Sequence, residues 1–142
     1  MVGSIRIISM IQNRILRKGI AVLIEAQPDM QFAGSAEDLD AVLHLFEASR
    51  ADLVLIDLDV RADKGLDAIR RIRSMQGNAW IIGLATHDGE EDCDLAIKAG
   101  AVTVIPKDLI GRMLVPLIRA GRPDHAESYQ RPEVVEVTSP EL

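Results

Sequence analysis

Short apolar runs alternate along the chain with longer segments in which apolar side chains recur every three or four residues. The apolar runs cover residues 5–9, 31–34, 53–56, 80–84 and 102–105. The segments of helical period that follow them cover residues 13–26, 37–48, 66–75, 90–99 and 109–119. A short run predicts a β-strand and a long periodic segment predicts an α-helix. The pattern therefore predicts five consecutive strand and helix units.

The predicted strands are apolar almost without interruption, which indicates burial on both faces of a sheet. Right-handed crossovers between such strands produce a parallel sheet with helices on both faces. We therefore expect an α/β fold with a five-stranded parallel sheet. Gly65 is predicted to open the third helix, and Gly100 to close the fourth. Pro116 lies inside the last helical segment, where proline costs about 3 kcal/mol, so we expect a kink or an early end there.

Composition narrows the class of protein. The 142 residues suit one domain. Its 16 basic and 22 acidic residues give 16 − 22 = −6, a net charge that opposes direct binding to nucleic acid or to an anionic membrane. One cysteine, Cys93, excludes an internal disulfide, and no apolar run approaches the roughly 18 residues of a membrane span. We expect a cytoplasmic protein.

The composition changes at Gly121. Residues 1–120 are predicted to form the domain, and residues 121–142 to form a linker or disordered tail with three spaced prolines. Residues 138–142 combine a hydroxyl, a proline and an acid in the order typical of a helix start. Two interpretations stay open: a terminal tail, or a linker that leads to a second domain absent from this sequence.

Asp57 directly follows the third apolar run, at the edge of the sheet where parallel α/β folds bind ligands. Taken alone, such a residue is more often an ordinary solvated carboxylate. Four stretches make the context more specific, at residues 5–8 with 17–19, at 51–58, at 65–73, and at 98–101 with 107–108. With these stretches the chain resembles, over residues 5–120, a receiver domain of two-component response regulators, a flavodoxin-like fold of CheY type. The resemblance is nearest to the NarL/FixJ branch, whose receivers precede LuxR-type DNA-binding domains.

The resemblance implies that Asp57 stands at the phosphoacceptor position and that Lys107 pairs with the phosphate. It also places the acidic pair that holds Mg²⁺ at Ile11 and Gln12, where this chain departs from the family. Neither an alkyl group nor an amide replaces carboxylates around a hard cation. We therefore expect no cofactor, and Mg²⁺ only if the domain is a working phosphoacceptor.

Two acids in the loop after Asp57, Asp59 and Asp63, are the candidate substitute ligands for such a metal. In the same loop Arg61 or Lys64 is a candidate countercharge for Asp57. Three carboxylates within a short loop do not make an EF-hand, because the required glycine and terminal glutamate are missing.

The conformational switch of the family departs as well. Its hydroxyl residue falls on Ala85 and its aromatic residue on Val104. Thr86 is one residue beyond Ala85, and a shift of one residue reverses the facing of a strand side chain. Thr86 is thus expected to point away from Asp57 unless the strand end bulges.

These departures favour an atypical receiver, or pseudo-receiver, that is not an enzyme and regulates by contact with proteins, its phosphorylation impaired or absent. The alternative is a conventional receiver that a histidine kinase phosphorylates on Asp57 and that controls a LuxR-type transcriptional output. A third hypothesis places a small-molecule ligand near Asp57, Arg61 and Lys107. The last helix is more apolar than one buried face requires, so a homodimer through that helix is also expected.

Overall fold

The computed structural model of the chain describes residues 4–59, 62–86 and 90–121. Its strands are β1 (Ile5–Met10), β2 (Met30–Ala36), β3 (Leu53–Asp57), β4 (Trp80–Ala85) and β5 (Thr103–Pro106). Its helices are α1 (Arg14–Glu25), α2 (Leu39–Ser49), α3 (Ala62–Met75), α4 (Glu90–Ala99) and α5 (Ile110–Ala120). A single 3-10 turn, η1 (Lys107–Leu109), joins β5 to α5. The predicted tail beyond residue 121 lies outside the described residues.

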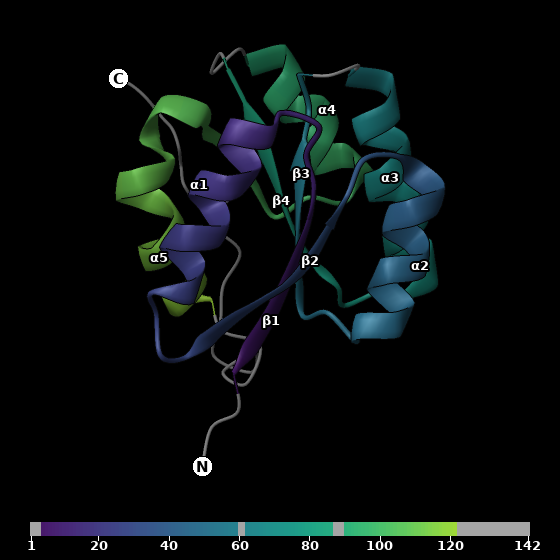
Figure 1. The fold of residues 1–142 in the computed structure, drawn as a ribbon. Helices are drawn as coiled ribbons and strands as arrows, with labels where there is room; N and C mark the ends of the chain where they lie inside the picture. Colours follow the sequence, from purple (N-terminus) through teal and green to yellow (C-terminus); the bar gives the residue numbers. More distant parts are fainter. Residues whose placement is uncertain (1–3, 60–61, 87–89, 122–142) are drawn as a thin grey trace.

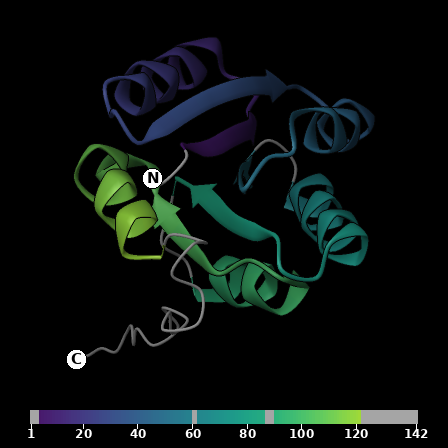
Figure 2. The same cartoon turned by 90° about the horizontal axis from the view of Figure 1, so that it is seen from below.

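The five strands form one parallel sheet in the order β2-β1-β3-β4-β5. This is the doubly wound order of flavodoxin-like folds, whose ligands bind at the carboxyl ends of the strands. Figures 1 and 2 show α1 and α5 together on one face of the sheet and α2, α3 and α4 on the other. The predicted α/β fold is confirmed.

The sheet is buried on both sides because side chains of one strand alternate between two hydrophobic cores. In β3, Leu53 and Leu55 join the core beneath α1 and α5, while Val54 and Ile56 join the core beneath α2, α3 and α4. All five residues of β3 are buried. The continuous apolar runs in the sequence thus reflect a sheet with two covered faces.

The start of α3 differs from the prediction, and of the two outcomes predicted at Pro116, a kink or an early end, the early end does not occur. Helix α3 begins at Ala62, so Gly65 lies inside its first turn and does not open it. A Cβ at Gly65 would lie 3.0 Å from Leu58 Cδ2 and 3.3 Å from the Asp57 carbonyl oxygen, so this glycine serves a close approach to the end of β3. Helix α5 does not end at Pro116. Pro116 lacks the N–H from which the Arg112 carbonyl would otherwise accept a hydrogen bond, and both residues are exposed.

Gly100 ends α4 as predicted, with a φ of 130° that side-chain-bearing residues rarely adopt. Within the described ranges, none of the helices is both long enough and apolar enough to cross a membrane.

Candidate functional site

Asp57 is the last residue of β3, and its side chain is only 2% exposed. Lys107 follows β5 directly, and its ammonium nitrogen lies 2.9 Å from Asp57 Oδ1. A carboxylate removed from water in this way requires a charged partner or hydrogen-bond donors. The structure therefore brings together the two residues that the sequence placed at the phosphoacceptor and phosphate-pairing positions.

Asp59 shares the same cation. Lys107 Nζ also lies 2.9 Å from Asp59 Oδ2. The backbone N–H of Asp59 donates to Asp57 Oδ1 over 2.9 Å, which fixes the loop so that both carboxylates approach one ammonium group. The result is a three-membered charged network at the carboxyl edge of the sheet.

Thr86 completes this network through two hydrogen bonds to Asp59. Its backbone N–H donates to Asp59 Oδ2 over 2.6 Å, and its hydroxyl group donates to the same oxygen. No sequence signal singled out this contact, although the strand register explains it. In the parallel ladder Asp57 pairs with Leu84, so two residues further along Asp59 lies beside Thr86.

The register between β4 and β5 places Lys107 next to these residues. Ala85 pairs with Pro106, so Thr86 lies beside Lys107. Just beyond the ends of β3, β4 and β5 there is therefore a row of three neighbouring residues, Asp59, Thr86 and Lys107. Asp57 lies two residues before Asp59, at the end of β3. The side chain of Thr86 contacts Asp59, and no direct hydrogen bond to Asp57 is found among the described contacts.

The contacts of Asp59 and Lys107 move their pKa values in opposite directions. Partial burial raises the pKa of Asp59, but hydrogen bonds from Thr86 and Lys107 outweigh it and bring the pKa below its ordinary value of 3.8. Burial lowers the pKa of Lys107, but hydrogen bonds to Asp57 and Asp59 reverse this and raise the pKa above 10.5. Both groups are therefore charged at neutral pH.

The positions of the family's acidic pair have other roles here. Ile11 is fully buried, in the core beneath α1 and α5. Gln12 is exposed, and its side-chain amide donates to the carbonyl oxygen of Glu37 over 3.1 Å. The Glu37 carboxylate in turn lies 3.6 Å from Arg17 Nη1. The β1–α1 loop thus packs its first side chain inward and uses its second to hold the β2–α2 loop.

A small cavity of about 20 Å³ adjoins Asp57. It is lined by Met10, Gln12, Glu37, Asp38, Leu39, Asp57, Lys64 and Gly65. Glu37 and Asp38 were not among the predicted site residues, because they come from a strand end far from Asp57 in the sequence. Lys64, a predicted countercharge, does line the cavity beside Asp57. Arg61 and the side chain of Asp63 lie outside the described part of the chain.

The donor set around this cavity does not suit Mg²⁺, the metal that the resemblance implies. Mg²⁺ requires near-octahedral oxygen ligands and usually keeps several waters, whereas this cavity has room for about one water molecule. Asp38 accepts a hydrogen bond from Ala41 N over 2.9 Å, as the cap of α2. Across the described side chains, no three His, Cys, Asp or Glu residues come together as metal ligands.

The two switch positions are apolar and packed. Ala85 is 1% exposed at the end of β4. Val104 is half-buried in β5 and packs against the core beneath α2, α3 and α4. Neither side chain has a polar group that could respond to charge on Asp57.

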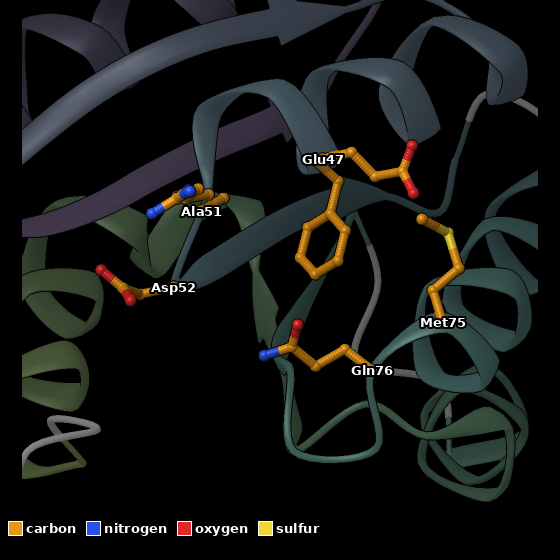
Figure 3. A pocket seen from close by; sticks show the side chains of 7 residues that line it. Glu47, Ala51, Asp52, Met75 and Gln76 are labelled. Atoms are coloured by element: carbon orange, nitrogen blue, oxygen red, sulfur yellow. The ribbon is translucent and has the colours of Figure 1, made fainter.

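A larger hollow of about 520 Å³ lies at the opposite edge of the sheet. Figure 3 shows it between the end of α2, with Glu47, and the end of α3, with Met75 and Gln76. Asp52, which lines it, precedes β3, so the hollow is at the amino ends of the strands. Ligands of open parallel sheets bind at the carboxyl ends, so its size alone does not make it the site.

Known proteins are similar to this chain in sequence and in fold. The model of the response regulator receiver domain family matches residues 8–119. An uncharacterized transcriptional regulatory protein, YxjL of Bacillus subtilis, is 34% identical over 75% of this chain and 49% of its own length. The nitrate/nitrite response regulator protein NarP of Escherichia coli is 31% identical over 75% of this chain and 50% of its own. The chain thus spans about half the length of these curated relatives.

Solved structures agree with the sequence comparison. A crystal structure of a LuxR-family two-component response regulator from Aurantimonas sp. is 30% identical, with a TM-score of 0.77 over 94% of this chain and 100% of that chain. The signal receiver domain of the NarL response regulator from Mycobacterium tuberculosis, 21% identical, has the same fold with a TM-score of 0.76. The chain belongs to the response regulator receiver domain family.

Proposed function

We propose that this receiver domain is atypical and regulates through protein–protein contact, with phosphorylation of Asp57 impaired or absent. The observation that supports this most strongly is the use made of the acidic-pair positions. Ile11 is fully buried in the core, and the amide of Gln12 is hydrogen-bonded to the β2–α2 loop. Neither position supplies a carboxylate next to Asp57.

The chemistry explains why this loss matters. Phosphoryl transfer depends on positioning and on stabilising the charge of the phosphoryl oxygens, and the metal ion contributes much of that stabilisation. In this chain the Lys107 ammonium group pairs with Asp57, and it is shared with Asp59. A phosphoryl group on Asp57 would therefore compete with Asp59 for Lys107.

The alternative is a conventional receiver that a histidine kinase phosphorylates and that controls a LuxR-type output. Two observations favour it. The Asp57–Lys107 pair is intact at 2.9 Å, and Glu37 and Asp38 line the same cavity as Asp57. A rearrangement that released both carboxylates from Arg17 and from the α2 cap would create a set of metal ligands.

Isothermal titration with Mg²⁺ separates the two functions. We expect the wild-type protein to show no saturable binding at millimolar Mg²⁺, and the same flat titration with Asp57→Asn. Saturable binding that disappears in Asp57→Asn and in Asp38→Asn would instead support the conventional receiver. Asp94→Asn is the matched control, because it removes an exposed carboxylate that does not line the cavity.

We also propose that the protein partners include a second copy of the chain. The last helix, α5, lies beside α1, and Arg119 near its end pairs with Asp29 in the loop after α1 at 3.0 Å. On the outer side of α1, Ile15 is 83% exposed and Val22 70% exposed. These two side chains lie seven residues apart on one helix and so share a face, and a shared exposed apolar face is the kind of surface that marks interaction sites. Sedimentation equilibrium of wild type and of Ile15→Glu/Val22→Glu tests this: the double variant should shift the population toward monomer, and an unchanged monomer in both would contradict the dimer.

A further inference from the structure

A single oxygen atom, Asp59 Oδ2, accepts hydrogen bonds from donors on two neighbouring strand ends. Lys107 Nζ lies 2.9 Å from it and the Thr86 backbone nitrogen 2.6 Å, and the Thr86 hydroxyl donates to it as well. An ammonium group, a backbone N–H and a hydroxyl converging on one point form a binding site for an oxyanion. We propose that the Asp59 carboxylate is a built-in ligand of this oxyanion site, in the place that a phosphate-class anion would otherwise take.

The loop geometry holds Asp59 in this site. Its backbone N–H is tied to Asp57 Oδ1 over 2.9 Å, and the N–H of Leu58 extends the ladder by donating to the Leu84 carbonyl over 2.9 Å. The carboxylate therefore reaches Thr86 and Lys107 from a fixed backbone. A tethered ligand has an effective concentration in the millimolar range or above, so a free anion must compete with it. The lowered pKa of Asp59 agrees with an ionised carboxylate in this position.

This inference deepens the proposed function and rests on it. In a receiver that requires an external phosphoryl group, the donors at the end of β4 receive an anion only when the signal arrives. Here the two donors of Thr86 already have one, the Asp59 carboxylate, which also pairs with Lys107. The carboxyl edge of the sheet is held in one arrangement without a ligand, and the surface that partners contact does not depend on phosphorylation.

The test is a titration with inorganic phosphate, which transfers no phosphoryl group to Asp57 and needs no metal. Asp57→Asn serves as the background, because it removes the second carboxylate that would repel phosphate. Asp57→Asn/Asp59→Ala opens the oxyanion site, and Asp57→Asn/Asp59→Asn keeps it filled by a neutral side chain of equal size. The readout is the Thr86 amide resonance in ¹H–¹⁵N spectra, with chloride at equal ionic strength as the control anion.

We expect phosphate to shift the Thr86 resonance at saturable, millimolar concentrations in the opened variant. Its affinity should exceed that of the background and of the filled variant by about ten-fold or more, as expected when one competing charge-assisted hydrogen bond is removed. An affinity within about two-fold of the background, or an equal response to chloride, would overturn the proposal. Asp57→Asn/Asp59→Ser is a second opened variant, used if circular dichroism shows that the alanine variant is unfolded.

The two proposals fail in different experiments. Acetyl-phosphate labelling of wild-type Asp57 would overturn the proposed function, whatever the phosphate titration shows. An unchanged phosphate affinity in the opened variants, together with no labelling, would overturn only the role of Asp59.

Discussion

The Lys107 ammonium nitrogen lies 2.9 Å from Asp57 Oδ1, and this contact supplies a cation to a carboxylate whose side chain is 2% exposed. Removal of the cation leaves a buried negative charge, which costs more than the ion pair contributes to stability. Lys107→Met should therefore lower the free energy of unfolding by about 1–3 kcal/mol, less than for a fully buried pair because Lys107 is partly exposed.

Urea unfolding followed by the fluorescence of Trp80, the only tryptophan, measures this change. Asp57→Asn/Lys107→Met should recover most of the lost stability, since the buried charge of Asp57 is then removed as well and Asp59, which is less buried, keeps its hydrogen bonds from Thr86. Lys98→Met is the matched control on an exposed helical lysine and should change the stability little. A Lys107→Met variant as stable as this control would contradict the account of the pair.

Stability should depend on pH at both ends of the range. The pKa of Asp59 is lower in the folded protein than its ordinary 3.8, so its contribution is present above about pH 3.8 and is lost as the pH falls through the folded value. The pKa of Lys107 is raised above 10.5, so its contribution is present below that pH and is lost as the pH rises through the folded value.

A comparison of wild type with Asp59→Asn measures how much Asp59 contributes to the pH dependence of stability at low pH. The difference in unfolding free energy between the two proteins should be constant near neutral pH and should shrink below about pH 3.8. Urea titrations at pH 7 and at acid pH measure it. A difference that grows on acidification would show that the sign of the Asp59 shift is wrong.

Restoration of the family's acidic pair should be tolerated at one position and not at the other. Ile11→Asp places a carboxylate in the core, where an unpaired charge costs about 3 kcal/mol or more. Gln12→Asp changes an exposed side chain and should alter stability by less than about 1 kcal/mol. Ile11→Val, which keeps the site apolar, should cost about 0.5–1.5 kcal/mol.

Thermal unfolding at neutral pH ranks the stabilities of these three variants. An Ile11→Asp variant as stable as Ile11→Val would mean that the first side chain of the pair can turn outward toward Asp57. The claim that the side chain at position 11 is committed to the hydrophobic core would then be wrong.

Alanine substitutions at Gly100 and Gly19 test the backbone conformations of these two glycines. Gly100 has a φ of 130°, and an added Cβ would lie 3.0 Å from Arg73 Nε, so Gly100→Ala should destabilise by about 1–3 kcal/mol. Gly19 lies in α1 with open space around the same position, so Gly19→Ala should stabilise by about 0.5–1 kcal/mol. Chemical denaturation compares the two, and equal effects of one sign would contradict the assigned conformations.

The sequence predicts the order of elements and the place of Asp57 well, because both depend on patterns local to the chain. The buried run 53–56 specifies a strand with two covered faces, and an acid at its end must reach the carboxyl edge of the sheet. The sequence pattern places the start of α3 too late, because Gly65 serves close packing against Leu58 and is not the helix boundary that a glycine there predicts.

The contacts of Asp59 are not predictable in the same way. Asp59 reaches Thr86 and Lys107 because three strand ends stop in register, and register is a property of pairing between distant segments. The sequence offers Asp59 only as a candidate substitute metal ligand, and it predicts that Thr86 faces away from Asp57 unless the strand end bulges. In the structure Asp59 contacts Thr86 instead. This contact can be predicted only when the register between β3 and β4 is known.

Intact-mass spectrometry after incubation with acetyl phosphate and Mg²⁺ tests the central claim most directly, with Asp57→Asn as the control. The proposed function predicts no phosphoryl adduct on the wild-type protein, because Ile11 and Gln12 stand where the family has its acidic pair and because Lys107 is shared with Asp59. A gain of one phosphoryl mass that disappears in Asp57→Asn would contradict this account and establish a working phosphoacceptor.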